Sequence, residues 1–461
     1  MAVDVEVVET RELGDRSYIA HDRATAVVID PQRDLDRVEA LLAAKALTCA
    51  MVLETHVHND YVTGGYELAR RTGVRYVLSA ADDVAFARHA VRDGDEMTAG
   101  GLRIRAVATP GHTDTHLAYV IDVPPGAPTA APGEAPAVFT GGSLLYGSVG
   151  RTDLVDPHRT EELARAQFHS ARRLAELLPD ETRVFPTHGF GSFCSSGSSS
   201  GDDSSTLGQE RARNDAFTEP DEDAFVARLV AGLTAYPRYY AHMGARNRQG
   251  PGPADLSPPQ RIDPEELRKR IAGGEWVVDL RHRTAYAAQH LTGSIGIELG
   301  QQFSTYLGWL IPWGTPLTLI GDSADQVASA QRQLVRIGID RPAGAAVGAP
   351  TQLAAGDELR SYPRASFADL AAQRSAGAGL LVLDVRRDDE RAAGAVPGSV
   401  HVPLHSLLER LDEVPDAQLW VHCASGFRAS IAASLLDRAG REVVLVDDDY
   451  TTAVRTGLAT G

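Results

Sequence analysis

The chain has 461 residues, and its 45 lysines and arginines against 62 aspartates and glutamates give a formal net charge of −17. An acidic surface repels phosphate backbones, which argues against nucleic acid as a partner. A content of 43% hydrophobic and 23% charged residues is typical of a soluble globular protein. The length predicts about three domains.

The three cysteines, Cys49, Cys194 and Cys423, are too few and too far apart for a disulfide framework. The segment Met1 to Glu6 is acidic where a signal peptide would be basic and then apolar, and no apolar run reaches membrane-spanning length. We therefore expect a cytoplasmic protein with no membrane partner. In a reducing compartment, a cysteine that matters is more often reactive than structural.

Residues 16–120 alternate short β-branched runs with helical patterns, which predicts an α/β fold. Strands are expected at 26–29 and 50–53, and helices at 35–44 and 65–72. A segment rich in Pro, Gly and Ala at 124–136 predicts a loop. A Gly- and Pro-rich linker at 244–259 then ends a first domain, which we place at residues 1–245.

The sequence beyond this linker repeats itself with an offset of 105 residues. The motifs Asp279-Leu-Arg281, Ala287-Ala288, Gly293-Ser294 and Leu299 recur as Asp384-Val-Arg386, Ala392-Ala393, Gly398-Ser399 and Leu404. One register kept over all these positions predicts two copies of one α/β domain. We place the copies at residues 260–345 and 362–461, with two unrelated α/β segments as the alternative.

Three histidine-bearing turns in the first domain each follow a predicted strand. They are Thr55-His56-Val57-His58-Asn59-Asp60 after Leu53, Gly111-His112-Thr113 after Ala108, and Pro186-Thr187-His188-Gly189 after Phe185. Ligands collect at the C-terminal ends of strands in α/β sheets, and imidazoles and carboxylates bind metal ions. The sequence therefore predicts a metal site made by His56, His58, Asp60, His112 and His188, the alternative being histidines with unrelated roles.

The motifs THVHND, TPGHT and PTHG resemble those of the metallo-β-lactamase superfamily, whose fold is an αββα sandwich. The segment FTGGSLLYGSVGRTDL at 139–154 resembles the persulfide dioxygenase branch, which includes fusions to rhodanese domains. This resemblance implies that His56 and His112 are two of the three ligands of one iron ion. It also implies a reaction in which glutathione persulfide and O₂ give sulfite and glutathione.

Two positions depart from this family pattern. Tyr61 stands where the THxHxDH motif ends in His, which removes a ligand of a second metal and disfavours a dinuclear zinc hydrolase. Gly142 stands where the branch has the Asp that is the third iron ligand, so His58, Asp60, His188 or water must complete the shell.

The identity of the metal stays open between Fe(II), which the resemblance favours, and Zn(II). Two histidines with one carboxylate suit iron, whereas three histidines suit zinc equally well. Three hypotheses therefore stand: a persulfide-oxidising metalloenzyme, a zinc thioesterase of the glyoxalase II type, and a degenerate metal domain.

Arg151 and Asp153, in the segment GRTD, also match the family motif. We expect Asp153 to orient a loop that carries a metal ligand, with a surface salt bridge as the alternative. For Cys194, which closely follows His188, a buried inert thiol is favoured over a place at the mouth of the site.

The second copy of the repeat carries the reactive cysteine. An expected strand at 419–422 leads into Cys423-Ala424-Ser425-Gly426-Phe427-Arg428, and a helix is predicted at 429–436. Unpaired backbone N–H groups and the positive end of the helix dipole stabilise a thiolate at this position. Gly426 lets the backbone wrap closely around an anion, which Arg428 helps to hold.

The four residues between Cys423 and Arg428 resemble the loop of rhodanese, because related cysteine phosphatases have one residue more. The resemblance implies that Cys423 takes sulfur from thiosulfate or a persulfide and passes it to a thiol of the glutathione type. Asp384 and Arg386 match the family's DVR element and, with Ser425, are expected to support the loop. Phosphate chemistry and a structural cysteine are the alternatives.

The first copy has Gly321 where the second has Cys423, and Gln326 where the second has Arg428. Because no nucleophile stands at the position of the cysteine, we expect the first copy to be catalytically silent. The sequence leaves the oligomeric state open, a homo-oligomer included.

Overall fold

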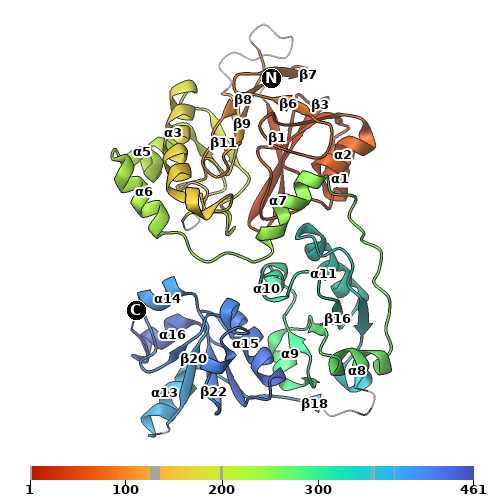
Figure 1. Ribbon diagram of the computed structural model, residues 1–461, viewed down its shortest axis with the longest axis vertical. Coiled ribbons are helices and arrows are strands. Elements are labelled where there is room, and N and C mark those ends of the chain that lie inside the picture. The colour runs from red at the N-terminus through yellow and green to blue at the C-terminus, as the bar shows by residue number, and fades with distance from the viewer. Residues whose placement is uncertain are drawn as a thin grey trace. The chain divides into compact units, whose positions relative to one another are not determined.

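The computed structural model describes residues 3–124, 135–197, 201–354, 356, 359–377 and 379–460. The chain divides into two compact units, shown in Figure 1. Unit 1 comprises Met1–Ala254 with Val335–Gly338, and unit 2 comprises Asp255–Leu334 with Ile339–Gly461. Most of the loop predicted at 124–136, namely residues 125–134, lies outside the described residues.

The first sheet of unit 1 has the strand order β1-β2-β3-β4-β5-β6. Its strands are β1 (Asp4–Thr10), β2 (Asp15–His21), β3 (Thr25–Ile29), β4 (Thr48–Leu53), β5 (Arg75–Ser79) and β6 (His89–Val91). The crossover helices α1 (Asp36–Ala44) and α2 (Gly65–Thr72) join β3, β4 and β5, which are parallel. Both predicted strands and both predicted helices of this region are confirmed.

The second sheet of unit 1 has the order β12-β11-β10-β9-β8-β7. Its strands are β7 (Glu96–Ala99), β8 (Leu102–Ala108), β9 (Leu117–Asp122), β10 (Ala137–Gly141), β11 (Arg183–Pro186) and β12 (Ser205–Thr206). The long helix α3 (Thr160–Leu177) connects the parallel pair β10 and β11. The helices α4 (Leu207–Arg213), α5 (Asp215–Thr218), α6 (Glu222–Ala231) and α7 (Tyr240–Gln249) follow.

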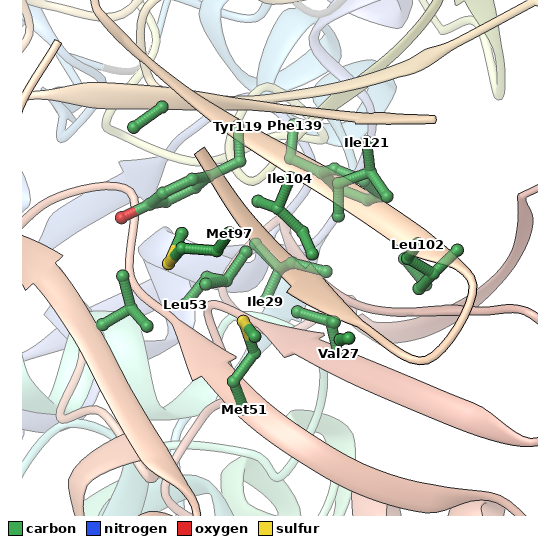
Figure 2. Close-up of a cluster of buried hydrophobic side chains, with 14 of the residues drawn as sticks. Val27, Ile29, Met51, Leu53, Met97, Leu102, Ile104, Tyr119, Ile121 and Phe139 are labelled. Atoms are coloured by element: carbon green, nitrogen blue, oxygen red, sulfur yellow. The ribbon is translucent and has the colours of Figure 1, made fainter. Parts of the chain in front are cut away.

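The main core of unit 1 lies between the two sheets, as Figure 2 shows. The first sheet contributes Val27, Ile29, Met51 and Leu53, and the second contributes Leu102, Ile104, Tyr119, Ile121 and Phe139. Further clusters pack α1 and α2 on the outer face of the first sheet, and α3 and α6 on that of the second. Each fully buried aliphatic side chain contributes about 1.5–3 kcal/mol. Unit 1 is therefore an αββα sandwich, as predicted.

The linker predicted from Gly244 is wrong in its first six residues, which form the end of α7. The glycines and prolines of residues 244–259 predicted a linker, but Gly244 is buried. A Cβ on Gly244 would lie 2.6 Å from Oδ1 of Asn59, so a larger residue there would displace the Asn59 side chain. Tertiary contacts here outweigh the low helix propensity of glycine.

Unit 2 contains two parallel sheets. The first has the order β15-β13-β16-β17, with β13 (Trp276–Asp279), β15 (Ile295–Gly296), β16 (Leu317–Gly321) and β17 (Gly344–Val347). The second has the order β19-β23-β22-β20-β21, with β19 (Arg364–Ala365), β20 (Leu381–Asp384), β21 (Val400–His401), β22 (Leu419–His422) and β23 (Val443–Val446). The short strands β14 (His290–Leu291) and β18 (Leu359–Arg360) pair with each other.

Helices flank both sheets of unit 2. They are α8 (Pro264–Ala272), α9 (Arg283–Ala288), α10 (Phe303–Leu310), α11 (Ala324–Arg336) and α12 (Pro350–Leu353) around the first sheet, and α13 (Phe367–Ser375), α14 (Asp388–Ala393), α15 (Phe427–Arg438) and α16 (Tyr450–Arg455) around the second. In the described parts of the chain, no helix is long and apolar enough to cross a membrane.

The repeated motifs make the same bonds in both sheets. Arg281 forms an ion pair with Asp279 at 2.6 Å and donates to the carbonyl of Gln289 at 2.9 Å. Arg386 pairs with Asp384 at 2.7 Å and donates to the carbonyl of Gly394 at 2.7 Å. Each contact in the second copy involves the residues 105 positions after those in the first, so the sequence repeat is also a repeat of structure.

Candidate functional site

Three buried imidazoles meet where the strands of the two sheets of unit 1 end. His56 follows β4, His112 follows β8 and His188 follows β11, and each side chain is at most 1% exposed. Their ring centroids are 4.9 Å (His56 to His112), 5.3 Å (His112 to His188) and 5.4 Å (His56 to His188) apart. One ligand nitrogen of each lies within 4.8 Å of the others.

The hydrogen bonds of the three rings leave one nitrogen of each available. Nδ1 of His56 lies 2.9 Å from the hydroxyl of Thr55, whose own proton goes to Asp30. Nδ1 of His112 lies 2.8 Å from the carbonyl oxygen of Arg151, and Nδ1 of His188 lies 2.9 Å from Asp15. When Nδ1 donates in this way, Nε2 carries the lone pair that binds a metal.

The distance between the nitrogens of two of these histidines fits a shared metal ion. Nε2 of His56 lies 3.4 Å from Nε2 of His188, and two nitrogens bound to one tetrahedral metal at about 2.1 Å are about 3.4 Å apart. Burial, together with the neighbouring imidazoles, holds the pKa of His56 well below its usual range and lowers that of His112 to about 3. Both rings are therefore neutral, as ligands must be.

The carboxyl groups of Asp60 and Asp15 lie beside His188. Nδ1 of His188 lies 3.2 Å from Asp60, and both carboxylate oxygens of Asp60 are buried and have no hydrogen-bond partner among the described residues. Burial opposes a proton on His188, but Asp60 and Asp15 raise the pKa of His188 to about 10. A cation bound at Nε2 would take the place of this proton as the positive charge beside Asp60.

His58 is held by other partners. Its Nε2 lies 3.0 Å from the Tyr61 hydroxyl, 3.2 Å from Glu54 and 3.4 Å from Asp30. Burial disfavours its charged form, but the two carboxylates raise the pKa of His58 to about 9. The Tyr61 hydroxyl also donates to the Asp30 carbonyl at 3.1 Å. His58 and Asp60 therefore both lie in the cluster of buried polar residues. Nε2 of His58 is engaged by Tyr61, Glu54 and Asp30.

The ring of His112 fills the space beside Gly142. A Cβ at Gly142 would lie within 3.0 Å of three ring atoms of His112, and a Cβ at Gly150 would lie 2.7 Å from Nδ1 of the same ring. A side chain at position 142 would therefore overlap the His112 ring unless that ring moved.

Arg151 and Asp153 form an ion pair that holds a hydrogen-bond partner of His112 in place. The buried guanidinium of Arg151 makes two bonds of 2.7 Å to Asp153 and donates to the carbonyls of Phe193 and Thr234. These bonds fix the backbone of Arg151, whose carbonyl oxygen receives the proton of His112. The alternative of a surface salt bridge is wrong, because the Arg151 side chain is only 2% exposed.

Four buried residues of the site were absent from the sequence prediction. Nε2 of His116 accepts from the backbone N–H of Gly142 at 3.1 Å and its Nδ1 contacts Thr109, so His116 shapes the glycine turn. The carboxylates are Asp15, Asp30 and Glu54. Two of these residues had a signal in the sequence. His116 is a second histidine four residues after His112, and Asp30 directly follows the strand at 25–29. Asp15 had no such signal.

Cys194 is fully buried, and burial raises the pKa of its thiol well above the usual range. A buried, protonated thiol is a poor nucleophile. This agrees with the expectation of an inert cysteine.

The second candidate site is the loop between β22 and α15. Cys423 is 1% exposed, and Gly426 caps α15 with a φ of 88°, in the left-handed region that favours glycine. The carbonyl of Ala424 accepts from the N–H of Tyr450 at 2.8 Å. The guanidinium of Arg386 lies 3.7 Å over the Tyr450 ring, so the Asp384–Arg386 pair supports the loop through Tyr450.

Arg428 binds a carboxylate of its own chain. Its guanidinium makes two bonds, of 2.5 and 2.6 Å, to Glu390 at the start of α14. Ser425 is exposed at the tip of the loop. An anion bound at Cys423 therefore relies on the backbone N–H groups at the start of α15 and shares Arg428 with Glu390.

The loop at the same place in the first copy is filled by a glutamine. Gln326 accepts from the N–H of Asp322 at 2.8 Å and donates to the carbonyl of Leu280 at 3.0 Å. Since all three cysteines of the chain lie elsewhere, this copy has no counterpart of Cys423.

Known proteins resemble both the N-terminal and the C-terminal parts of the chain. Residues 367–453 match the model of the rhodanese-like domain. The structure of a metallo-β-lactamase from Staphylococcus aureus subsp. aureus COL aligns with 76% of this chain and 100% of its own, with a TM-score of 0.66 and 26% identity. The structure of ETHE1 from Myxococcus xanthus aligns with 53% of this chain and 98% of its own, with a TM-score of 0.44 and 29% identity.

A hydroxyacylglutathione hydrolase from Prochlorococcus marinus (strain MIT 9303) is 34% identical over 166 residues, which are 35% of this chain and 58% of that protein. The chain thus spans less than two thirds of this curated relative. The N-terminal region of the chain therefore has the metallo-β-lactamase fold, and residues 367–453 form a rhodanese-like domain.

Proposed function

We propose that this chain is an enzyme of sulfur metabolism that oxidises a glutathione-type persulfide at its metal centre and transfers sulfur through Cys423. One observation carries the proposal: a single chain holds a buried centre of three convergent imidazoles and a cysteine between a strand and a helix of a rhodanese-like domain. Two sulfur chemistries in one chain favour a shared substrate, a low-molecular-weight persulfide.

At the metal centre, His56, His112 and His188 are the proposed ligands, and Asp60 is the adjacent carboxylate. The segment at 139–154 favours Fe(II), with Zn(II) as the alternative. The metal supplies open positions for a thiolate and for O₂. The overall reaction is GSSH + O₂ + H₂O → GSH + SO₃²⁻ + 2 H⁺.

At the second site, the Cys423 thiolate attacks the outer sulfur of thiosulfate. The S–S bond breaks, sulfite leaves with the electron pair, and Cys423 carries the sulfur as a persulfide. A thiol of the glutathione type then takes this sulfur and becomes the persulfide on which the metal centre acts. The three free cysteines fit a reducing compartment, and we propose the cytoplasm.

A zinc-dependent thioesterase is the second candidate, favoured by the relatedness to hydroxyacylglutathione hydrolases. Two features count against it. Tyr61 replaces a ligand of the second metal and holds His58, and the His112 ring lies where a bridging carboxylate would start at position 142.

The two candidates are separated by substrate. One preparation of the full chain is offered glutathione persulfide in an oxygen electrode, and separately a hydroxyacylglutathione thioester with detection of released thiol. O₂ uptake without thioester cleavage supports the proposal. Thioester cleavage without O₂ uptake supports the hydrolase.

Restoring the family's carboxylate at position 142 is expected to harm the metal site. In Gly142→Asp the new Cβ overlaps the His112 ring, so the ring must move away from the other ligands. Overpacking of this kind costs about 1–3 kcal/mol. We expect lower metal content by mass spectrometry and a lower thermal midpoint.

The matched control is Gly197→Ala, because a Cβ there would have its nearest neighbour 3.7 Å away, at Ser148. This variant should keep both the metal and the midpoint. Higher metal content in Gly142→Asp than in the parent protein would contradict the placement of His112.

A further inference from the structure

A carboxylate from the end of β23 packs directly against the Cys423 loop. A Cβ on Gly426 would lie within 3.0 Å of Oδ1 of Asp447 and 3.2 Å from its Cα. The side chain of Asp447 is 11% exposed. Since Gly426 is three residues from Cys423 and caps α15, a negative charge on Asp447 stands beside the place where an anionic sulfur donor must bind.

The nearest cationic partner of Asp447 lies in the first copy of the repeat, the one without a cysteine. Nε of Arg283, at the start of α9, lies 2.7 Å from Oδ1 of Asp447, whereas Arg364 of its own copy is 3.5 Å away. Glu298 holds Arg283 in place, because it binds NH1 at 2.5 Å and the backbone N–H at 2.9 Å. Arg283 Nε also lies 3.3 Å from the Cβ position at Gly426.

Two other carboxylates near the loop are paired with arginines of the second copy. Glu390 is paired with Arg428, and Asp384 is paired with Arg386. Asp447 therefore differs from them in taking its closest cation from the first copy. Removing that cation leaves a largely buried negative charge next to the loop, where it repels an anionic sulfur donor such as thiosulfate.

We propose that Arg283 is a positioning residue for sulfur transfer at Cys423: it neutralises Asp447, so that the loop can bind an anionic sulfur donor. The silent copy is then a working part of the active site, although it has lost its own cysteine. This inference rests on the proposed sulfur transfer at Cys423.

The test compares two ion pairs of unit 2, each made with a carboxylate of the second copy. In Arg283→Met the KM for thiosulfate should rise about tenfold, with kcat changed less than about twofold. The control is Arg360→Met, because Arg360 in β18 pairs with Asp437 at the far end of α15 at 3.0 Å. The control should keep the KM of the parent protein.

A second readout does not need sulfur transfer. The full chain is alkylated with anionic iodoacetate and with neutral iodoacetamide, and modification of Cys423 is followed by mass spectrometry. The ratio of the iodoacetate rate to the iodoacetamide rate should fall in Arg283→Met and not in Arg360→Met. If Cys423 transfers no sulfur, the proposed function fails while this ratio still tests the role of Arg283.

Two further variants separate charge from folding. Asp447→Asn removes the carboxylate and keeps its shape, so its KM should not rise. Arg283→Met combined with Asp447→Asn should have a lower KM than Arg283→Met alone, although Glu298 also loses its partner. An equal change in Arg283→Met and Arg360→Met would overturn the proposal. So would a raised KM in Asp447→Asn, or a double variant as impaired as Arg283→Met.

Discussion

Replacement of Cys423 by Ser is expected to remove sulfur transfer from thiosulfate to cyanide, with a loss of at least about 1000-fold. The hydroxyl is a far weaker nucleophile than the thiolate, and it cannot carry sulfur as a persulfide. The loop itself should survive, because Gly426 caps the helix and Tyr450 binds the loop carbonyl without help from the sulfur. The measurement is thiocyanate formation.

Cys49→Ser is the matched control for this variant. Cys49 lies in β4 of unit 1, and burial raises the pKa of its thiol to about 11, so it is a poor nucleophile at neutral pH. Sulfur transfer should be unchanged in this control. Substantial residual transfer in Cys423→Ser would contradict the assignment of Cys423.

The second large effect is expected at His112. His112→Ala removes one of three convergent ligands and leaves a cavity between Gly142 and Gly150, so metal affinity should fall more than about 100-fold. O₂ uptake with glutathione persulfide should disappear, while thiocyanate formation by Cys423 should remain. Metal affinity is measured by competition with a chromophoric chelator.

The control is His169→Ala, because His169 is an exposed histidine on α3 of the same unit. It should leave metal affinity unchanged. Retention of the metal in His112→Ala would show that the three imidazoles do not form the site.

The positions of His56, His112 and His188 could be predicted from sequence, because each follows an apolar strand and strand ends meet at one edge of a sandwich. Their hydrogen-bond partners could not. The carbonyl of Arg151 is 39 residues from His112, and Asp15 is 173 residues from His188. Contacts between such distant residues depend on how the sheets pack, which sequence periodicity does not specify.

At Gly142, the lack of a carboxylate could be predicted from the sequence, but the surroundings of this residue could not. The missing carboxylate was visible in the sequence, but the ring of His112 in its place depends on the turn at 141–142. In unit 2, the Asp-x-Arg repeat predicted a shared architecture. The same ion pair between the Asp and the Arg is present in both copies. The pairing of Arg428 with Glu390 had no sequence signal, because the two residues are 38 positions apart.

The central claim is that one chain joins persulfide oxidation at a three-histidine metal centre to sulfur transfer at Cys423. Its most direct test is the metal content of protein purified without chelator, measured with O₂ uptake on glutathione persulfide in the same sample. We predict one iron ion per chain and O₂ uptake with formation of sulfite, both lost in His112→Ala. Zinc with thioester cleavage and no O₂ uptake, or protein without metal, would contradict the claim.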